Sequence, residues 1–148
     1  MRTVSKTVIG VDFGTQSARA VLVNAENGEI IYSCRKEYPY NSTPVPAIDC
    51  AENLPCATDY EMTLYELLRN VIPEEYRKTV AGICVDATSL TMVLLAEDGR
   101  ALSELDGWSE AAHARVKLWK YHRAQEKADE ALNLARNLQE PFLGRTGG

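Results

Sequence analysis

Two short apolar runs, separated by a polar turn, lie near the start of the chain. Residues 7–13 and 18–25 are mostly apolar, and Gly14 to Ser17 lies between them. This pattern predicts a strand–turn–strand hairpin. Asn27-Gly28 is a typical hairpin turn, and the alternation from Glu29 to Tyr38 predicts a third strand. Together the three segments predict an antiparallel meander.

A helical pattern and two further strand patterns follow a proline-containing loop. Residues 39–58 include four prolines, which predicts a long irregular loop. From Asp59, apolar residues recur at helical spacing until Pro73, which ends or restarts the helix. We predict a buried strand over residues 78–86 and a further strand, closed by a turn, over residues 91–96.

The last part of the chain combines a short strand pattern with an amphipathic helix pattern. Alternation over residues 115–119 predicts a short strand, and residues 123–138 predict a helix with one apolar and one charged face. Strands and helices interleave along the chain, so the predicted class is α/β. The apolar face of the predicted helix consists of Ala124, Ala128, Ala131, Leu132, Ala135 and Leu138.

Length and charge narrow the class of protein. The chain has 148 residues, enough for one domain with its own core. Its net charge of −5 is unfavourable for binding nucleic acid or an anionic membrane, so we predict neither partner. The N-terminal residues lead into a strand pattern and lack the apolar segment of a signal peptide. We therefore predict a cytoplasmic protein.

The cysteine pattern does not favour a zinc site. The four cysteines form no Cys-x-x-Cys pair, and both histidines are distant from them in sequence. We predict reduced, structural thiols. Cys84 lies in an apolar run and is predicted to be a small buried hydrophobic residue. The other cysteines are Cys34, Cys50 and Cys56.

A carboxylate and a small polar turn lie at the tip of the first predicted hairpin. Gly14 allows a ligand to approach the backbone closely, and the N–H and hydroxyl groups that follow can donate to phosphate oxygens. Asp12 can hold a hard cation such as Mg²⁺, directly or through water. The alternative interpretation is an ordinary polar hairpin tip. The candidates for phosphate binding are Gly14, Thr15, Gln16, Ser17 and Arg19, and Asp12 is the candidate metal ligand.

A second polar group follows the strand predicted over residues 78–86. In α/β sheets, ligands bind beyond the carboxyl ends of the strands. The residues at this end offer the carboxylate and hydroxyl groups that hydrogen-bond a polyol. The alternative is a hydroxyl-rich turn that satisfies its own backbone. The residues concerned are Asp86, Thr88, Ser89 and Thr91.

A third candidate group immediately precedes the last predicted helix. The indole face of Trp119 can pack against the C–H surface of a sugar, and Lys120 and His122 can donate to oxygens or to a phosphate. The alternatives are a core aromatic for Trp119 and a surface residue near a helix start for His122.

Taken together, these motifs resemble a known family. Val11 to Ala20 resembles the first phosphate loop of the actin-like ATPase superfamily, in which the hairpin grips the phosphates of ATP and the Asp organises Mg²⁺. Val85 to Met92 resembles the Asp-x-Thr-Ser-x-Thr-Met segment of the L-ribulokinase branch of the FGGY carbohydrate kinases. The stretch from His113 to Gly148, with Trp-Lys-x-His at 119–122, resembles the same branch.

The resemblance implies a ribonuclease-H-like α/β domain with a mixed sheet and flanking helices. Residues 1–148 would form an incomplete first lobe. Family members have two such lobes with the active site in the cleft between them, and the second lobe supplies the catalytic Asp and the adenosine pocket. We therefore expect no catalytic residue in this chain and little or no turnover by the chain alone.

The implied parent activity is the ATP-dependent phosphorylation of a ketopentose, L-ribulose to L-ribulose 5-phosphate. ATP and Mg²⁺ are the implied cofactors, and the sugar is the implied small-molecule partner. Ala87 departs from the pattern of the branch, which often has an aromatic residue there, and residues 39–58 do not align with it. The residues implied on the sugar side are Ala87, Thr88, Ser89, Trp119 and Lys120.

Two other functions fit part of the pattern. A non-catalytic sugar- or nucleotide-binding module of the same superfold predicts binding without turnover. Another actin-like member, such as an acyl-phosphate kinase or a chaperone-type ATPase, shares the phosphate loop but gives no reason for the segment around Trp119. A partial lobe exposes apolar surface, so we also expect self-association into dimers or larger homo-oligomers.

Overall fold

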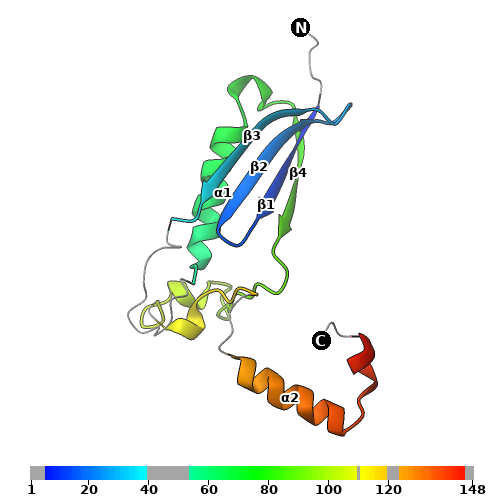
Figure 1. The fold of residues 1–148 in the computed structure, drawn as a ribbon. Helices are drawn as coiled ribbons and strands as arrows, with labels where there is room; N and C mark the ends of the chain where they lie inside the picture. The colour runs from blue at the N-terminus through cyan, green and yellow to red at the C-terminus, as the bar shows by residue number, and fades with distance from the viewer. Residues whose placement is uncertain (1–5, 40–53, 110, 120–123, 146–148) are drawn as a thin grey trace.

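In the part of the chain that the structure describes, the regular structure consists of one mixed sheet, two α-helices and several short 3-10 helices (Figure 1). The computed structural model describes residues 6–39, 54–109, 111–119 and 124–145. The antiparallel meander is confirmed, with its strand bounds shifted by at most one residue. The elements are β1 (Thr7–Phe13), β2 (Ser17–Asn24), β3 (Ile30–Glu37), α1 (Ala57–Val71), β4 (Val80–Ala87) and α2 (Gln125–Asn137).

The four strands lie in the order β3-β2-β1-β4. β1 pairs antiparallel with β2 and parallel with β4, and the chain crosses from the meander to β4 through α1. Asp12 of β1 lies opposite Arg19 on one side and opposite Asp86 on the other. Because β1 and β4 are parallel, their carboxyl ends meet at the same edge of the sheet.

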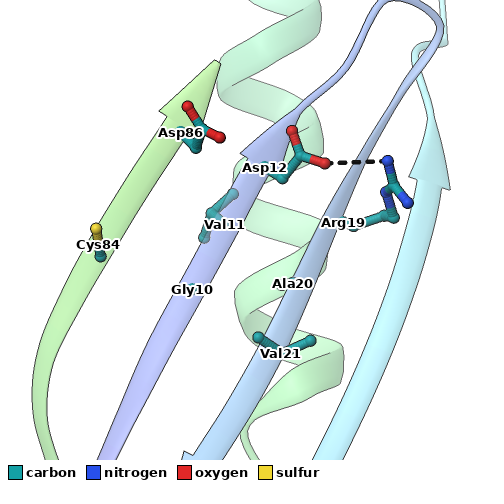
Figure 2. A pocket seen from close by; sticks show the side chains of 8 residues that line it. All are labelled: Gly10, Val11, Asp12, Arg19, Ala20, Val21, Cys84 and Asp86. Atoms are coloured by element: carbon teal, nitrogen blue, oxygen red, sulfur yellow. Dashed lines mark ion pairs between the residues drawn. The ribbon is translucent and has the colours of Figure 1, made fainter. Parts of the chain in front are cut away.

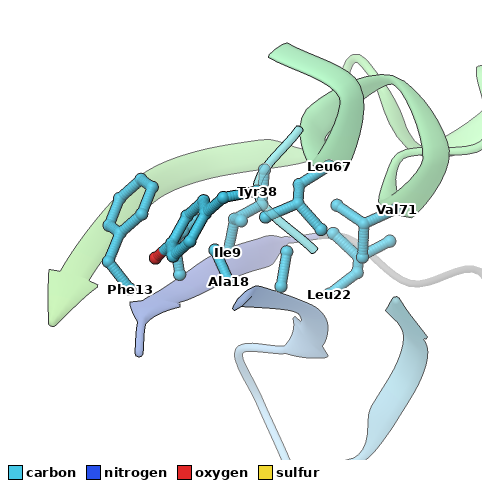
Figure 3. Packing of buried hydrophobic residues seen from close by; sticks show 9 residues of the cluster. Ile9, Phe13, Ala18, Leu22, Tyr38, Leu67 and Val71 are labelled. Carbon is cyan, nitrogen blue, oxygen red and sulfur yellow. The ribbon is translucent and has the colours of Figure 1, made fainter. Parts of the chain in front are cut away.

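The core lies between one face of the β1–β2 hairpin and α1 (Figure 3). Alternate residues of both strands are buried, because period-two alternation sends them to the face that α1 covers. Leu67 and Val71 project from α1 into this layer, one helical turn apart. The buried residues of the two strands are Ile9, Val11, Phe13, Ala18, Ala20 and Leu22.

The helix α1 begins slightly earlier than its apolar pattern indicates. Asp59 is fully buried, and its carboxylate accepts a hydrogen bond from the Cys56 backbone N–H at 2.8 Å. A carboxylate in the first turn satisfies a donor that has no partner within the helix. The predicted helix is therefore confirmed, with Asp59 in its first turn.

The prediction of a buried strand over residues 78–86 is right about the strand and wrong about burial. Ile83 is 54% exposed and Val85 is 57% exposed. The cause is that α1 packs against β2 and β3, while β4 lies at the far edge of the sheet (Figure 1). Cys84 is also exposed, so its predicted burial is wrong too. Cys34, Cys56 and Cys84 are free thiols, and Cys50 lies outside the described residues.

The strands predicted over residues 91–96 and 115–119 do not form. Met92 and Lys117 make an isolated antiparallel bridge, and Leu95 makes another with Ala101. Neither segment pairs with the sheet, so two short apolar alternations produce bridges and turns instead of a ladder. The chain between them includes short 3-10 helices at Leu102–Glu104 and Ala112–Ala114.

The helix predicted over residues 123–138 is confirmed as α2, but its apolar face is largely exposed. Of the residues predicted on that face, Ala135 is buried. Leu138 is exposed, and so is Leu134 beside it. The helix extends away from the sheet (Figure 1). Within the described segments, no helix is both long and apolar enough to cross a bilayer.

Truncating the core should separate buried from exposed leucines. We expect Leu67→Ala to lower the free energy of unfolding by about 2–5 kcal/mol, because it leaves a cavity between α1 and the hairpin. Urea denaturation followed by far-UV circular dichroism measures this loss. Leu134→Ala on α2 is the matched control, with an expected loss of about 0.5 kcal/mol or less. Equal losses would contradict the assignment of the core.

Candidate functional site

The turn between β1 and β2 is closed by its own backbone. The N–H of Gly14 donates to the carbonyl oxygen of Ser17 at 3.0 Å. A Cβ atom on Gly14 would lie 3.1 Å from the same oxygen, which is closer than ordinary van der Waals contact. Glycine therefore keeps the turn tight. Since the N–H of Gly14 is used inside the turn, phosphate contacts would come from the residues after it.

Tyr38, just beyond β3, makes two hydrogen bonds to the backbone of the turn. Its hydroxyl donates to the Gly14 carbonyl at 2.8 Å, and its backbone N–H donates to the Gln16 carbonyl at 3.3 Å. The ring is buried beside Phe13 in the core (Figure 3). Burial raises the pKa of Tyr38, and the nearby Tyr60 and carboxylates add to the effect. The phenol therefore stays a protonated donor at neutral pH.

The sheet face opposite α1 presents three charged side chains beside the turn (Figure 2). The Arg19 guanidinium forms an ion pair with the Asp12 carboxylate at 3.1 Å. Asp86 occupies the register position next to Asp12 on β4. All three line a cavity of about 330 Å³, whose floor is mostly apolar and includes Gly10 and Val21.

The carboxylates on this face fit a weakly held magnesium ion. Mg²⁺ is usually bound by one or two carboxylates, with waters and substrate phosphates as the other ligands. Asp12 and Asp86 provide such a pair at the ends of neighbouring parallel strands. In the described residues no group of three or more His, Cys, Asp or Glu side chains could form a complete protein cage. A cation here would therefore depend on phosphate oxygens, and it would compete with Arg19 for Asp12.

A second guanidinium reaches the turn from β3. Arg35 donates from Nε to the Ser17 hydroxyl at 2.9 Å. Arg35 also lies opposite Arg19 in the register of β2 and β3. Two arginines therefore flank the hydroxyl-bearing turn, and their charge is suited to an anionic ligand.

A hydrogen bond joins the turn to the segment before α2. The indole Nε1–H of Trp119 donates to the Thr15 hydroxyl at 3.1 Å, across 104 residues of sequence. Trp119 is 60% exposed, which argues against the alternative of a core aromatic. Its neighbours Lys120 and His122 lie outside the described residues.

The hydroxyl-rich segment after β4 continues along the end of β1. The N–H of Thr88 donates to the Phe13 carbonyl at 3.0 Å, and the hydroxyls of Thr88 and Thr91 are 2.6 Å apart. Leu90, between them, has a left-handed backbone with φ of 59°, which is uncommon for a bulky residue. Ser89 is exposed. A cavity of about 210 Å³ is lined by Phe13, Tyr60, Ala87, Thr88, Thr91 and Val93.

The structure therefore brings the three sequence-predicted groups to the carboxyl end of β1. Asp12 and Arg19 lie on the open face, Thr15 contacts Trp119, and Thr88 pairs with Phe13. Sequence reasoning missed Arg35, Tyr38 and Tyr60. Strand alternation could have placed Arg35 beside Arg19, but the positions of the two tyrosines depend on packing between distant segments.

Curated proteins similar to this chain are sugar kinases. A ribulokinase from Halalkalibacterium halodurans is 33% identical over 152 aligned residues, which cover 97% of this chain and 27% of that protein. A ribulokinase from Mycolicibacterium smegmatis is 35% identical over 153 aligned residues, with the same coverage. The chain thus spans 27% of the length of these relatives. No protein-family model matches it.

Two solved structures share the fold. A gluconate kinase and a ligand-bound xylulose kinase, both from Lactobacillus acidophilus, each match with a TM-score of 0.61 and 20% identity. Each match covers 90% of this chain and 24% of the other. At this identity the likeness concerns the fold alone, and it confirms the predicted mixed sheet with flanking helices.

In sequence the chain is similar to carbohydrate kinases, and its fold is similar to part of two such kinases. Within that class, the curated relatives described above are ribulokinases. The resemblance noted around Asp12, Thr88 and Trp119 is therefore confirmed at the level of the whole sequence.

Removing the Tyr38 hydroxyl should lower the free energy of unfolding and change how that free energy depends on pH. We expect Tyr38→Phe to lower the free energy of unfolding by about 1 kcal/mol at neutral pH, the usual net value of one hydrogen bond. The folded-state pKa of Tyr38 is raised, so this contribution is fully present below about pH 10 and is lost as pH rises through the folded-state pKa.

Urea denaturation at a series of pH values measures the difference between the two proteins. The control is Tyr32→Phe, which removes a hydroxyl from an exposed tyrosine of β3 and should leave the free energy of unfolding within about 0.5 kcal/mol. A Tyr38→Phe protein as stable as wild type would show that the turn does not depend on this bond.

Proposed function

We propose that the chain carries the phosphate-binding and sugar-binding part of an ATP-dependent kinase that phosphorylates L-ribulose, or a related ketopentose, to the 5-phosphate. The observation that carries the proposal is the hydrogen bond between Trp119 and Thr15. It joins a candidate sugar-side residue to a candidate phosphate-side residue, as a phosphoryl transfer between the two ligands requires.

On the phosphate side, catalysis of this kind depends on positioning and charge neutralisation. Thr15, Gln16 and Ser17 would hold phosphate oxygens, with Gly14 allowing the close approach. Arg19 would neutralise negative charge on the phosphates when Asp12 binds Mg²⁺. ATP supplies the phosphoryl group, and Mg²⁺ neutralises charge on its phosphates. The ion pair between Arg19 and Asp12 supports this arrangement, because it holds the carboxylate on the open face beside the turn.

On the sugar side, the proposed contacts are a stacking surface and a row of hydroxyls. Trp119 offers an exposed indole face, and aromatic faces pack well against sugar C–H groups. The cavity beside Ala87 and Thr88 supports a polyol nearby. The proposed sugar-binding residues are Ala87, Thr88, Ser89, Trp119 and Lys120.

We further propose that residues 1–148 correspond to an incomplete first lobe of such a kinase. The supporting observation is that the chain spans 27% of the length of its ribulokinase relatives. The catalytic base and the adenosine pocket would then lie outside this chain, which should bind ligands without turnover. The alternative of a non-catalytic binding module makes the same prediction for the chain but not for a longer protein.

A coupled assay of ADP release tests the proposal directly. We expect the 148-residue chain with Mg-ATP to release no ADP above background, with or without L-ribulose. Calorimetric titration of the same protein should show saturable binding of L-ribulose in the presence of Mg-ATP. Sugar-stimulated ADP release would overturn the proposal that the chain is an incomplete first lobe. A lack of sugar binding would argue against the kinase assignment of this site.

Replacing the indole should separate the ribulokinase interpretation from other actin-like ATPases. We expect Trp119→Ala to weaken L-ribulose binding about tenfold or more, because it removes both the stacking face and the bond to Thr15. Trp108→Ala is the matched control, since the Trp108 ring makes an edge-on contact with His113 and takes no part in the proposed site. Sugar affinity unchanged in Trp119→Ala would favour a chaperone-type or acyl-phosphate member.

A further inference from the structure

Tyr60 is an aromatic residue in the first turn of α1 whose hydroxyl has no structural explanation. Its ring lies 5.8 Å from that of Phe13 in an edge-on contact and 5.0 Å from that of Tyr38. Both contacts need only the ring. The hydroxyl oxygen is buried, and it has no hydrogen-bond partner in the part of the chain that the structure describes.

A buried hydroxyl without a partner is unfavourable for folding and is rare in native structures. A phenylalanine would make the same ring contacts at position 60 without this cost. Tyr38 provides the contrast, because its hydroxyl bonds the Gly14 carbonyl at 2.8 Å. The Tyr38 hydroxyl therefore stabilises the fold, whereas the Tyr60 hydroxyl makes no hydrogen bond within the described residues.

Tyr60 also lines the cavity of about 210 Å³ at the carboxyl ends of β1 and β4. The walls combine aromatic rings, from Phe13 and Tyr60, with the hydroxyl pair of Thr88 and Thr91. A polyol has the matching chemistry, since its C–H groups pack on rings and its hydroxyls bond hydroxyls. The volume suits a few carbons of such a chain.

We propose that Tyr60 is a sugar-binding residue whose hydroxyl donates a hydrogen bond to a hydroxyl of a polyol seated in this cavity. The inference rests on the proposed function and adds a donor from α1 to the sugar side. Burial, with the Asp59 carboxylate adding to it, raises the pKa of Tyr60 to about 12. The phenol is therefore a donor throughout the neutral range.

Access to this hydroxyl requires a small shift of the segment after β4. That segment is held by the Thr88 N–H on the Phe13 carbonyl, by the Thr88–Thr91 hydroxyl pair and, at its end, by the bridge between Met92 and Lys117. Leu90 adds an uncommon left-handed backbone and a side chain in solvent. A polyol can replace the bond between the two threonines by bonds to itself, so that both threonines and Tyr60 contact the ligand.

The test is the variant Tyr60→Phe, measured by thermal unfolding and by calorimetric titration with L-ribulose in the presence of Mg-ATP. We expect a melting temperature equal to or above that of wild type, together with a dissociation constant raised about tenfold, as loss of one hydrogen bond predicts. The control is Tyr65→Phe on the exposed side of the same helix, which should change neither quantity.

Each other outcome overturns the inference. A lowered melting temperature would show that the hydroxyl serves the fold. An unchanged dissociation constant, with wild-type protein binding the sugar, would show that Tyr60 does not contact it, while the proposed function would stand. Wild-type protein that binds no L-ribulose would overturn the inference and the sugar assignment of the site together.

Discussion

Burial of one face of the β1–β2 hairpin under α1 is the constraint on which the rest of the structure depends. Ile9, Val11 and Phe13 can be buried only if their neighbours in sequence face the other way. Asp12 is one of those neighbours, so its carboxylate is directed to the open face by the packing of apolar residues on the opposite side. The charge arrangement beside the turn is thus a by-product of core formation.

The same constraint links stability to chemistry through aromatic residues. The rings of Phe13, Tyr38 and Tyr60 pack together where the hairpin, the end of β3 and the start of α1 meet. Because its ring is packed there, the Tyr38 hydroxyl is placed to donate a hydrogen bond to the Gly14 carbonyl in the polar turn. The hydrogen bonds from Tyr38 therefore hold the turn in place. A ligand would find the donors of the turn already arranged, which lowers the entropy lost on binding.

The elements that could be predicted from the sequence are those that depend on nearby residues. The hairpin, the turn at Asn27-Gly28 and the two helices follow from local alternation, turn residues and the helical spacing of apolar residues. The exposure of β4 could not be predicted in this way. An apolar strand is buried only if another layer covers it, and α1 covers β2 and β3 instead. The contact of Trp119 with Thr15 spans 104 residues, and only the resemblance to a family connected the two beforehand.

The position of β4 has a consequence for the handling of this chain. In the described structure it is an edge strand of the sheet, and the apolar side chains of Ile83 and Val85 are exposed to solvent because α1 packs against β2 and β3. The outer edge of such a strand is a template to which a second polypeptide can add its own backbone hydrogen bonds. Association of chains through this edge would lower the solubility of the protein despite its net charge of −5.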